Sequence, residues 1–147
     1  MKSLINLNTF IKNNTKKLNS LSVLILRIGI SFSMIYLHRY PRLKNFSVIR
    51  DTFADPLGIG SPTSLALVVF AEFFCSIFII IGLLTRWSCV PLIITMCVAT
   101  WIINGGKEFI YQEKSIIYLV SYISLFVSGA GYYSLDYLLS RKNTTTK

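Results

Sequence analysis

The sequence predicts an all-α membrane protein, a bundle of four transmembrane helices with an interfacial amphipathic helix after the first of them. Hydrophobic residues make up 53% of the 147 residues, charged residues only 14%, and the mean hydropathy is +0.59. Such a composition is typical of a membrane protein rather than a soluble domain. The charges also gather between four apolar runs, each about as long as a helix that crosses a bilayer. The length predicts one domain.

The four apolar runs are residues 21–37, 63–84, 87–103 and 115–129. At about 1.5 Å per residue they rise roughly 22 to 33 Å, against a hydrocarbon core of about 30 Å. The fourth run is the shortest, and the polar residues 112–114 extend it with their charged ends at the interface. Because lipid offers no partner to backbone N–H and C=O groups, each run is predicted to be helical.

Outside the runs, we predict a polar basic tail over residues 1–19, the membrane domain over 20–139 and a second basic tail over 140–147. Within 42–53, Leu43, Phe46, Ile49 and Phe53 recur at helical spacing among polar residues. This pattern predicts an amphipathic helix that lies in the membrane interface. A turn over 55–60 follows, and Ser61-Pro62 is predicted to cap the second membrane helix.

Short connections determine the packing of the later helices. Only Thr85-Arg86 separates the second run from the third, so these two helices must be antiparallel neighbours. Asn104-Gly-Gly106 is predicted to end helix three, and Gly129-Ala-Gly131 is predicted to end helix four. Residues 132–141 then form a short interfacial helix that Ser134 caps.

The net charge of +9 comes from basic residues that flank the apolar runs. These positions suit anionic lipid headgroups, so the predicted partner is the lipid bilayer and not nucleic acid. With the N-terminus inside, the segments on the cytoplasmic side hold 8 Lys and Arg residues, against 6 on the other side. The excess favours an orientation with both termini inside.

Each predicted helix carries one stripe of polar or small residues at helical spacing, which predicts a bundle interior more polar than its lipid-facing surface. The four stripes are Arg27, Ser31, Met34 and His38; Glu72, Cys75 and Ser76; Cys97, Thr100 and Asn104; and Ser121, Ser124 and Ser128.

Arg27 and Glu72 are the only charges well inside the runs. Each unpaired charge at mid-membrane costs about 2.5–3.5 kcal/mol, so pairing is predicted. Two interpretations of the pair stay open at this point. It is either a structural ion pair that fixes helix register or the floor of an intramembrane cavity for a polar or quinone-like headgroup.

The candidate intramembrane site therefore comprises Arg27 and Glu72 with Ser31, His38, Cys75, Asn104 and Glu113. No metal site is predicted, since the three cysteines form no Cys-x-x-Cys pair and fit small hydrophobic positions. One histidine cannot supply both axial ligands of a b-type haem. No cofactor motif is evident, and quinone is the one cofactor considered.

Three motifs resemble the DoxX family of small four-helix membrane proteins. The stretch LRIGISFSMIYLHRYPRL resembles the first helix of the family, in which His38 and Leu43 match, Arg42 stands for a lysine and Arg39 replaces a glycine. AEFFCSIFIIIGLLTRW resembles its second helix, and GAGYYSLD resembles its Gly-Pro-Gly-Arg-Tyr-Ser-Leu-Asp ending. Glu113 stands where the family has an acidic residue, and DPLGIGS resembles the first loop of one branch.

The resemblance spans about residues 20–139 and implies an accessory membrane subunit of a quinone- or thiol-linked redox system in a bacterial cytoplasmic (inner) membrane. The alternative is a non-enzymatic scaffold, assembly factor or small-ligand binder in which the ion pair is structural. Either reading allows a partner protein or a homo-oligomer. A small-solute transporter is disfavoured, because four helices leave little room for alternating access.

Overall fold

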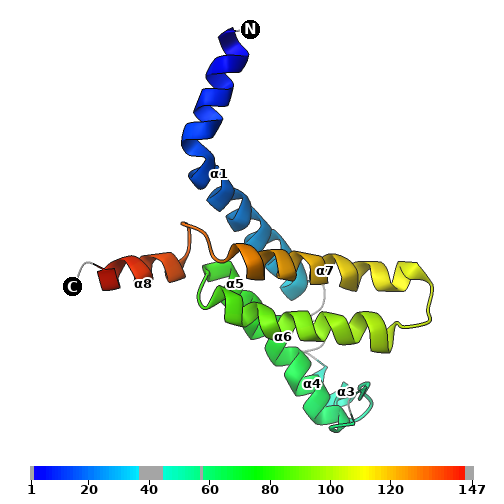
Figure 1. The fold of residues 1–147 in the computed structure, drawn as a ribbon. Coiled ribbons are helices and arrows are strands. Elements are labelled where there is room, and N and C mark those ends of the chain that lie inside the picture. Colours follow the sequence, from blue (N-terminus) through cyan, green and yellow to red (C-terminus); the bar gives the residue numbers. More distant parts are fainter. Residues whose placement is uncertain (1, 37–44, 57, 145–147) are drawn as a thin grey trace.

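The computed structural model describes residues 2–36, 45–56 and 58–144, and within these ranges every regular element is helical (Figure 1). The elements are α1 (Lys2–Met34), α3 (Phe46–Ile49), α4 (Ser61–Val69), the π-helix η2 (Phe70–Cys75), α5 (Ser76–Ile81), α6 (Thr85–Cys97), the π-helix η3 (Val98–Ile103), α7 (Phe109–Ser128) and α8 (Leu135–Thr144).

Three helices in the described part of the chain are long and apolar enough to cross a membrane: Asn14–Met34, Ser61–Ile81 and Thr85–Ile103. They coincide with the first three predicted runs, which confirms an all-helical membrane protein. The α7 helix contains most of the predicted fourth run and lies antiparallel to α6 (Figure 1). The α1 helix packs against α5 and α7.

The first helix is longer than predicted. The α1 helix begins at Lys2 and runs without a break through the segment predicted as a tail. Figure 1 shows the N-terminal part of α1 projecting from the bundle. The first 20 residues contain neither proline nor glycine, so nothing in them interrupts a helix that has already formed. The predicted boundary at residue 20 therefore lies inside one continuous helix.

The second and third membrane helices form an antiparallel pair, as predicted. Gly82 ends α5 in the left-handed conformation, with φ of +72°, and α6 begins at Thr85. Each of the two helices contains a π-helical segment, η2 in the second and η3 in the third. The predicted stops after helices three and four are also confirmed, since Asn104 and Gly129 are their C-caps.

The start of α4 differs from the prediction. Gly60, not Ser61, is the N-cap residue, and no side chain of the helix caps it. The Asp55 carboxylate organises the turn before the helix, because it accepts hydrogen bonds from the N–H groups of Ile59 at 3.1 Å and Gly60 at 2.7 Å. It also accepts one from the Ser64 hydroxyl at 2.8 Å. That hydroxyl, followed by the amide groups, lowers the pKa of Asp55.

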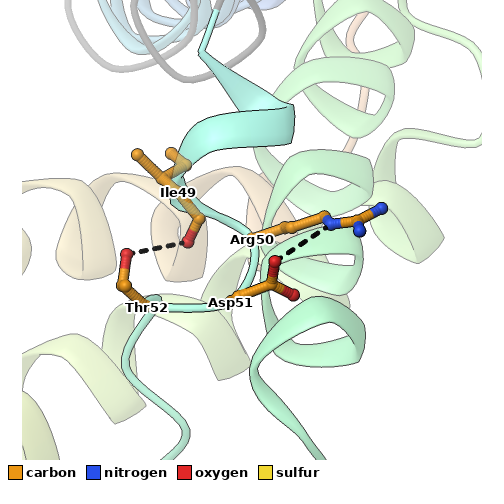
Figure 2. Close-up of polar contacts among 4 residues, drawn as sticks. All are labelled: Ile49, Arg50, Asp51 and Thr52. Atoms are coloured by element: carbon orange, nitrogen blue, oxygen red, sulfur yellow. Dashed lines mark hydrogen bonds and ion pairs between the residues drawn. The ribbon is translucent and has the colours of Figure 1, made fainter.

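The predicted amphipathic segment 42–53 is described only from residue 45 onward, and His38 lies outside the described residues. The single helical turn α3 covers Phe46–Ile49. In the turn that follows, Arg50 Nε pairs with Asp51 Oδ2 at 3.3 Å and the Thr52 hydroxyl donates to the Ile49 carbonyl at 3.4 Å (Figure 2). Both charges of this pair are largely exposed.

The core lies between α1, η2, α5, α6 and α7. Its buried side chains are mostly large and apolar: Met34, Ile79, Leu92, Met96, Tyr118, Leu119, Tyr122 and Leu125, with Cys75 and Cys89 among them. The predicted inward stripe of α7 is wrong, because Ser124 and Ser128 are exposed. Since Ser121 and Ser128 donate to carbonyls four residues back, their hydroxyls need no interior partner.

Candidate functional site

The side chain of Arg27 is almost completely buried, with 1% of its surface exposed. Its guanidinium donates hydrogen bonds from Nη1 to the Ala130 carbonyl and from Nη2 to the carbonyls of Ile80 and Tyr133, both at 3.1 Å. Ile80 lies in the last turn of α5, where carbonyls lack helical partners. Arg27 therefore joins α1 to the end of α5 and to the α7–α8 connection.

Asp136 completes this arrangement from the first turn of α8. Its carboxylate accepts hydrogen bonds from the N–H groups of Leu84 at 2.7 Å and Thr85 at 3.0 Å, and so caps α6 from another part of the chain. Its own N–H donates to the Gly82 carbonyl at 2.9 Å. The carboxylate also attracts Arg27 electrostatically. We call Arg27, Asp136 and the carbonyls of Ile80, Ala130 and Tyr133 the clasp.

Gly82 is the position at which the clasp has least room. A Cβ atom there would lie 2.6 Å from Ser134 Cβ and 2.8 Å from Arg27 Nη1. Ser134 itself caps α8, as predicted, because its hydroxyl accepts the N–H of Tyr137 at 3.2 Å. The left-handed backbone at residue 82 and the crowding around it both require glycine.

The structure does not pair Arg27 with Glu72. Glu72 lies eight residues before Ile80 on the same helix, about 12 Å away along its axis, and among the described residues it is not a partner of Arg27. The prediction considered only charges inside the apolar runs. Asp136 lies just outside the fourth run. The backbone carbonyls that bind Arg27 belong to no particular residue type, so a search for opposite charges could not find them. The Asp at the end of GAGYYSLD was the signal that could have found it.

Glu72 instead lines a separate cavity of 160 Å³. Its side chain is buried, with 4% exposed. The walls come from the first loop, from the second helix and from the third: Phe53, Ala54, Pro56, Ile59, Ser64, Leu67, Val68, Ile94, Thr95, Val98, Ala99 and Ile103. Leu67 and Ile94 are more than half exposed, so the cavity opens on the outer surface of the bundle. We call it the Glu72 pocket.

Two local features shape the Glu72 pocket. The turn that Asp55 organises brings Phe53, Pro56 and Ile59 over the cavity. The π-helical segments η2 and η3 both border the cavity, since Glu72 lies in one and Val98 and Ile103 in the other. Single π-turns inside longer helices are frequent at functional sites.

The other predicted site residues are distributed as follows. Ser31 is buried one turn after Arg27, and its hydroxyl has no hydrogen-bond partner in the described part of the chain. Cys75 is buried in the core beside Cys89. Asn104 is half-buried and its carbonyl accepts a hydrogen bond from Gln112, whereas Glu113 is exposed. Neither Asn104 nor Glu113 lines the Glu72 pocket. The described residues contain no group of three metal-ligating side chains.

A family model for DoxX matches residues 22–105, which is more than half of the chain. The chain belongs to the DoxX family. The family resemblance drawn from the sequence motifs is thereby confirmed, and the matched segment contains Arg27 and Glu72. Comparison with curated proteins and with solved structures gave no significant match. The Asp136 half of the clasp lies beyond the matched segment of this DoxX protein.

Double-mutant cycles distinguish the two arrangements of Arg27. We expect Arg27→Met and Asp136→Asn to destabilise the protein less in combination than the sum of the single effects, because each single change leaves one charge uncompensated. Arg27→Met and Glu72→Gln should add within about 0.5 kcal/mol. Unfolding of the detergent-solubilised protein measures both cycles. Strong coupling between Arg27 and Glu72 with none to Asp136 would contradict the clasp.

Gly82 offers a matched test of crowding. Gly82 and Gly106 both have a left-handed φ, at +72° and +79°, but a Cβ at Gly106 meets no atom within 4 Å. Gly106→Ala should cost only the backbone strain of about 1–3 kcal/mol. Gly82→Ala should add about 1–3 kcal/mol for overpacking against Ser134 and Arg27. The free energy of unfolding is measured for both variants. Equal losses of stability would show that a Cβ at residue 82 fits beside Arg27 and Ser134, which would contradict the crowding.

Proposed function

We propose that this DoxX protein is an accessory membrane subunit of a redox system, and that the Glu72 pocket holds the headgroup of a quinone. One observation carries the proposal: a buried carboxyl group stands at the wall of an otherwise largely apolar cavity, midway along a helix able to cross a membrane. Placing an ionisable side chain at that depth in a membrane costs free energy, and such residues usually mark functional sites.

The size of the Glu72 pocket supports a ligand with a single six-membered ring. A cavity of about 150 Å³ accommodates benzene in a well-studied engineered case, and this one measures 160 Å³. The carboxyl of Glu72 supplies the polar contact. As a carboxylate it accepts a hydrogen bond from a quinol hydroxyl, and when protonated it donates one to a quinone carbonyl. Thr95 and Ser64 add hydroxyl groups to the lining.

The position of the opening supports a ligand that arrives through the bilayer. Leu67 and Ile94 border the cavity and are exposed on apolar helices. A molecule with a ring and a long apolar tail can therefore leave its tail among the lipid chains while the ring reaches Glu72. A soluble substrate would have to cross that same apolar surface.

The membrane arrangement that accompanies this proposal has four spanning helices. The α7 helix has 20 residues, about 30 Å in length, and packs along α6. Residues 45–53 lie in the interface, both termini face the inside, and the membrane is the bacterial cytoplasmic one. The chain is expected to need a partner protein that carries the electrons.

Orientation has its own test. With the buried Cys75 and Cys89 and the half-buried Cys97 replaced by alanine, a new cysteine at Arg50 should react with an impermeant thiol reagent in intact cells, because this exposed position then faces outward. A cysteine at Lys142 should react only after the membrane is opened. The reverse pattern would invert the proposed topology.

A non-enzymatic scaffold or assembly factor is the second candidate, and one observation favours it. Every hydrogen bond of Arg27 in the described part of the chain goes to a backbone carbonyl, which is a structural role. The two candidates therefore differ only at Glu72, where a scaffold requires no bound ligand.

Glu72→Leu roughly keeps the size of the side chain but removes its hydrogen-bonding groups, and Ala99→Leu fills the Glu72 pocket from the opposite wall. We expect both variants to fold and to bind a short-chain ubiquinone analogue at least tenfold more weakly, since each removes either the polar contact or the space. Glu113→Gln, a change at an exposed carboxylate, is the control and should bind normally.

Binding is measured on protein purified in lipid nanodiscs, by titration with the quinone analogue. Quantification of native quinone that co-purifies provides a second readout. Unchanged binding in both pocket variants would overturn the proposal. Absence of any quinone from the wild type, together with retention of a client protein by the Ala99→Leu variant, would favour the scaffold.

A further inference from the structure

A second and larger cavity lies at the opposite end of the second and third helices from the Asp55 turn. This cleft of 690 Å³ is bordered by Ser20 of α1, the start of α6 and the connection from α7 to α8. Trp87, Tyr132 and Tyr137 stand along it. The Glu72 pocket shares no residue with this cleft, so an inference about the cleft is independent of the proposed quinone site.

We propose that this cleft binds the phosphate-bearing headgroup of an anionic phospholipid. Arg86 is the cation that faces it. Its guanidinium lies over Gly129, where an added Cβ would be 3.5 Å from Nε. In the described part of the chain it makes one hydrogen bond, a long one of 3.4 Å from Nη2 to the Val127 carbonyl. The guanidinium therefore keeps donors for a phosphate, which arginine binds in a bidentate manner.

Thr85 gives an independent indication of a ligand. Its side chain borders the cleft and is buried, with 1% exposed. Its hydroxyl nevertheless has no hydrogen-bond partner among the described residues. A buried hydroxyl without a partner costs about 1–3 kcal/mol. A phosphate oxygen held by the neighbouring Arg86 would satisfy it once the Thr85 side chain turned toward the cleft.

The charge around the cleft favours an anion. Among the described residues, the charged side chains that line it are Arg86 and Asp136. Both oxygens of Asp136 are occupied by the N–H groups of Leu84 and Thr85, and Arg27 lies behind it. The carboxylate in the lining is thus already compensated, and Arg86 determines the local charge.

The apolar surroundings indicate a lipid rather than a free anion. Trp87 is 74% exposed and Leu84 55% exposed, and both border the cleft at the end of helices able to cross a membrane. Tryptophan and tyrosine are enriched at the level of lipid headgroups. An acyl chain can lie against Leu84 and Trp87 while the headgroup reaches Arg86 and Thr85.

Native mass spectrometry of the full chain tests the proposal, with equimolar phosphatidylglycerol and phosphatidylcholine as probes. The wild type should retain phosphatidylglycerol in preference. Arg86→Gln should reduce that retention about fivefold, as expected for one basic residue near a headgroup, and Arg86→Lys should largely restore it. Arg50→Gln is the control, because Arg50 is also exposed but is already paired with Asp51 (Figure 2).

Thr85→Val keeps the shape of the side chain and removes the hydroxyl, so it should fold and retain less phosphatidylglycerol even if Arg86→Gln fails to fold. Equal retention of the two lipids by the wild type, or equal losses in the Arg50 and Arg86 variants, would overturn the proposal. Displacement of the lipid by inorganic phosphate, but not by chloride at the same ionic strength, would show a site for free anions and also overturn it.

Discussion

The fold depends on a single buried guanidinium. A charge in the low-dielectric interior is tolerated only when its hydrogen-bonding groups are satisfied, and Arg27 satisfies most of its own with backbone carbonyls. Those carbonyls belong to the end of α5 and to the connection between α7 and α8. Three segments far apart in the sequence are thereby held at one point. Asp136 strengthens this arrangement, because it balances the charge of Arg27 and caps α6 at the same time.

The sequence predicted the helices well because lipid leaves the backbone few alternatives. The apolar runs located the spans Ser61–Ile81 and Thr85–Ile103, and Ser134 was correctly predicted as a cap. The burial of Arg27, Ser31 and Met34 on one helical face also followed from their spacing. The tail was mistaken for a separate segment, since polarity predicts contact with water but does not by itself end a helix.

The candidate site was predicted only in part. Burial of Arg27 and Glu72 was expected, but their partners depend on which carbonyls the tertiary structure brings near, and no residue type encodes that. The serines of α7 show the same limit. Ser121 and Ser128 donate hydrogen bonds to carbonyls of their own helix, so the polar stripe did not indicate the inward face of α7. The inward face is the one that carries the large side chains of Tyr118, Tyr122 and Leu125.

Separation of Arg27 from Glu72 changes what each charge is able to do. An ion pair with Arg27 at the floor of the cavity would make that floor hydrophilic. With Arg27 engaged by carbonyls near the end of α5, Glu72 faces an apolar cavity between two π-helical segments. Both π-helical segments border the Glu72 pocket, while Ile79 of α5 and Cys89 and Leu92 of α6 are fully buried in the core. The same two helices thus supply both buried side chains of the core and walls of the Glu72 pocket.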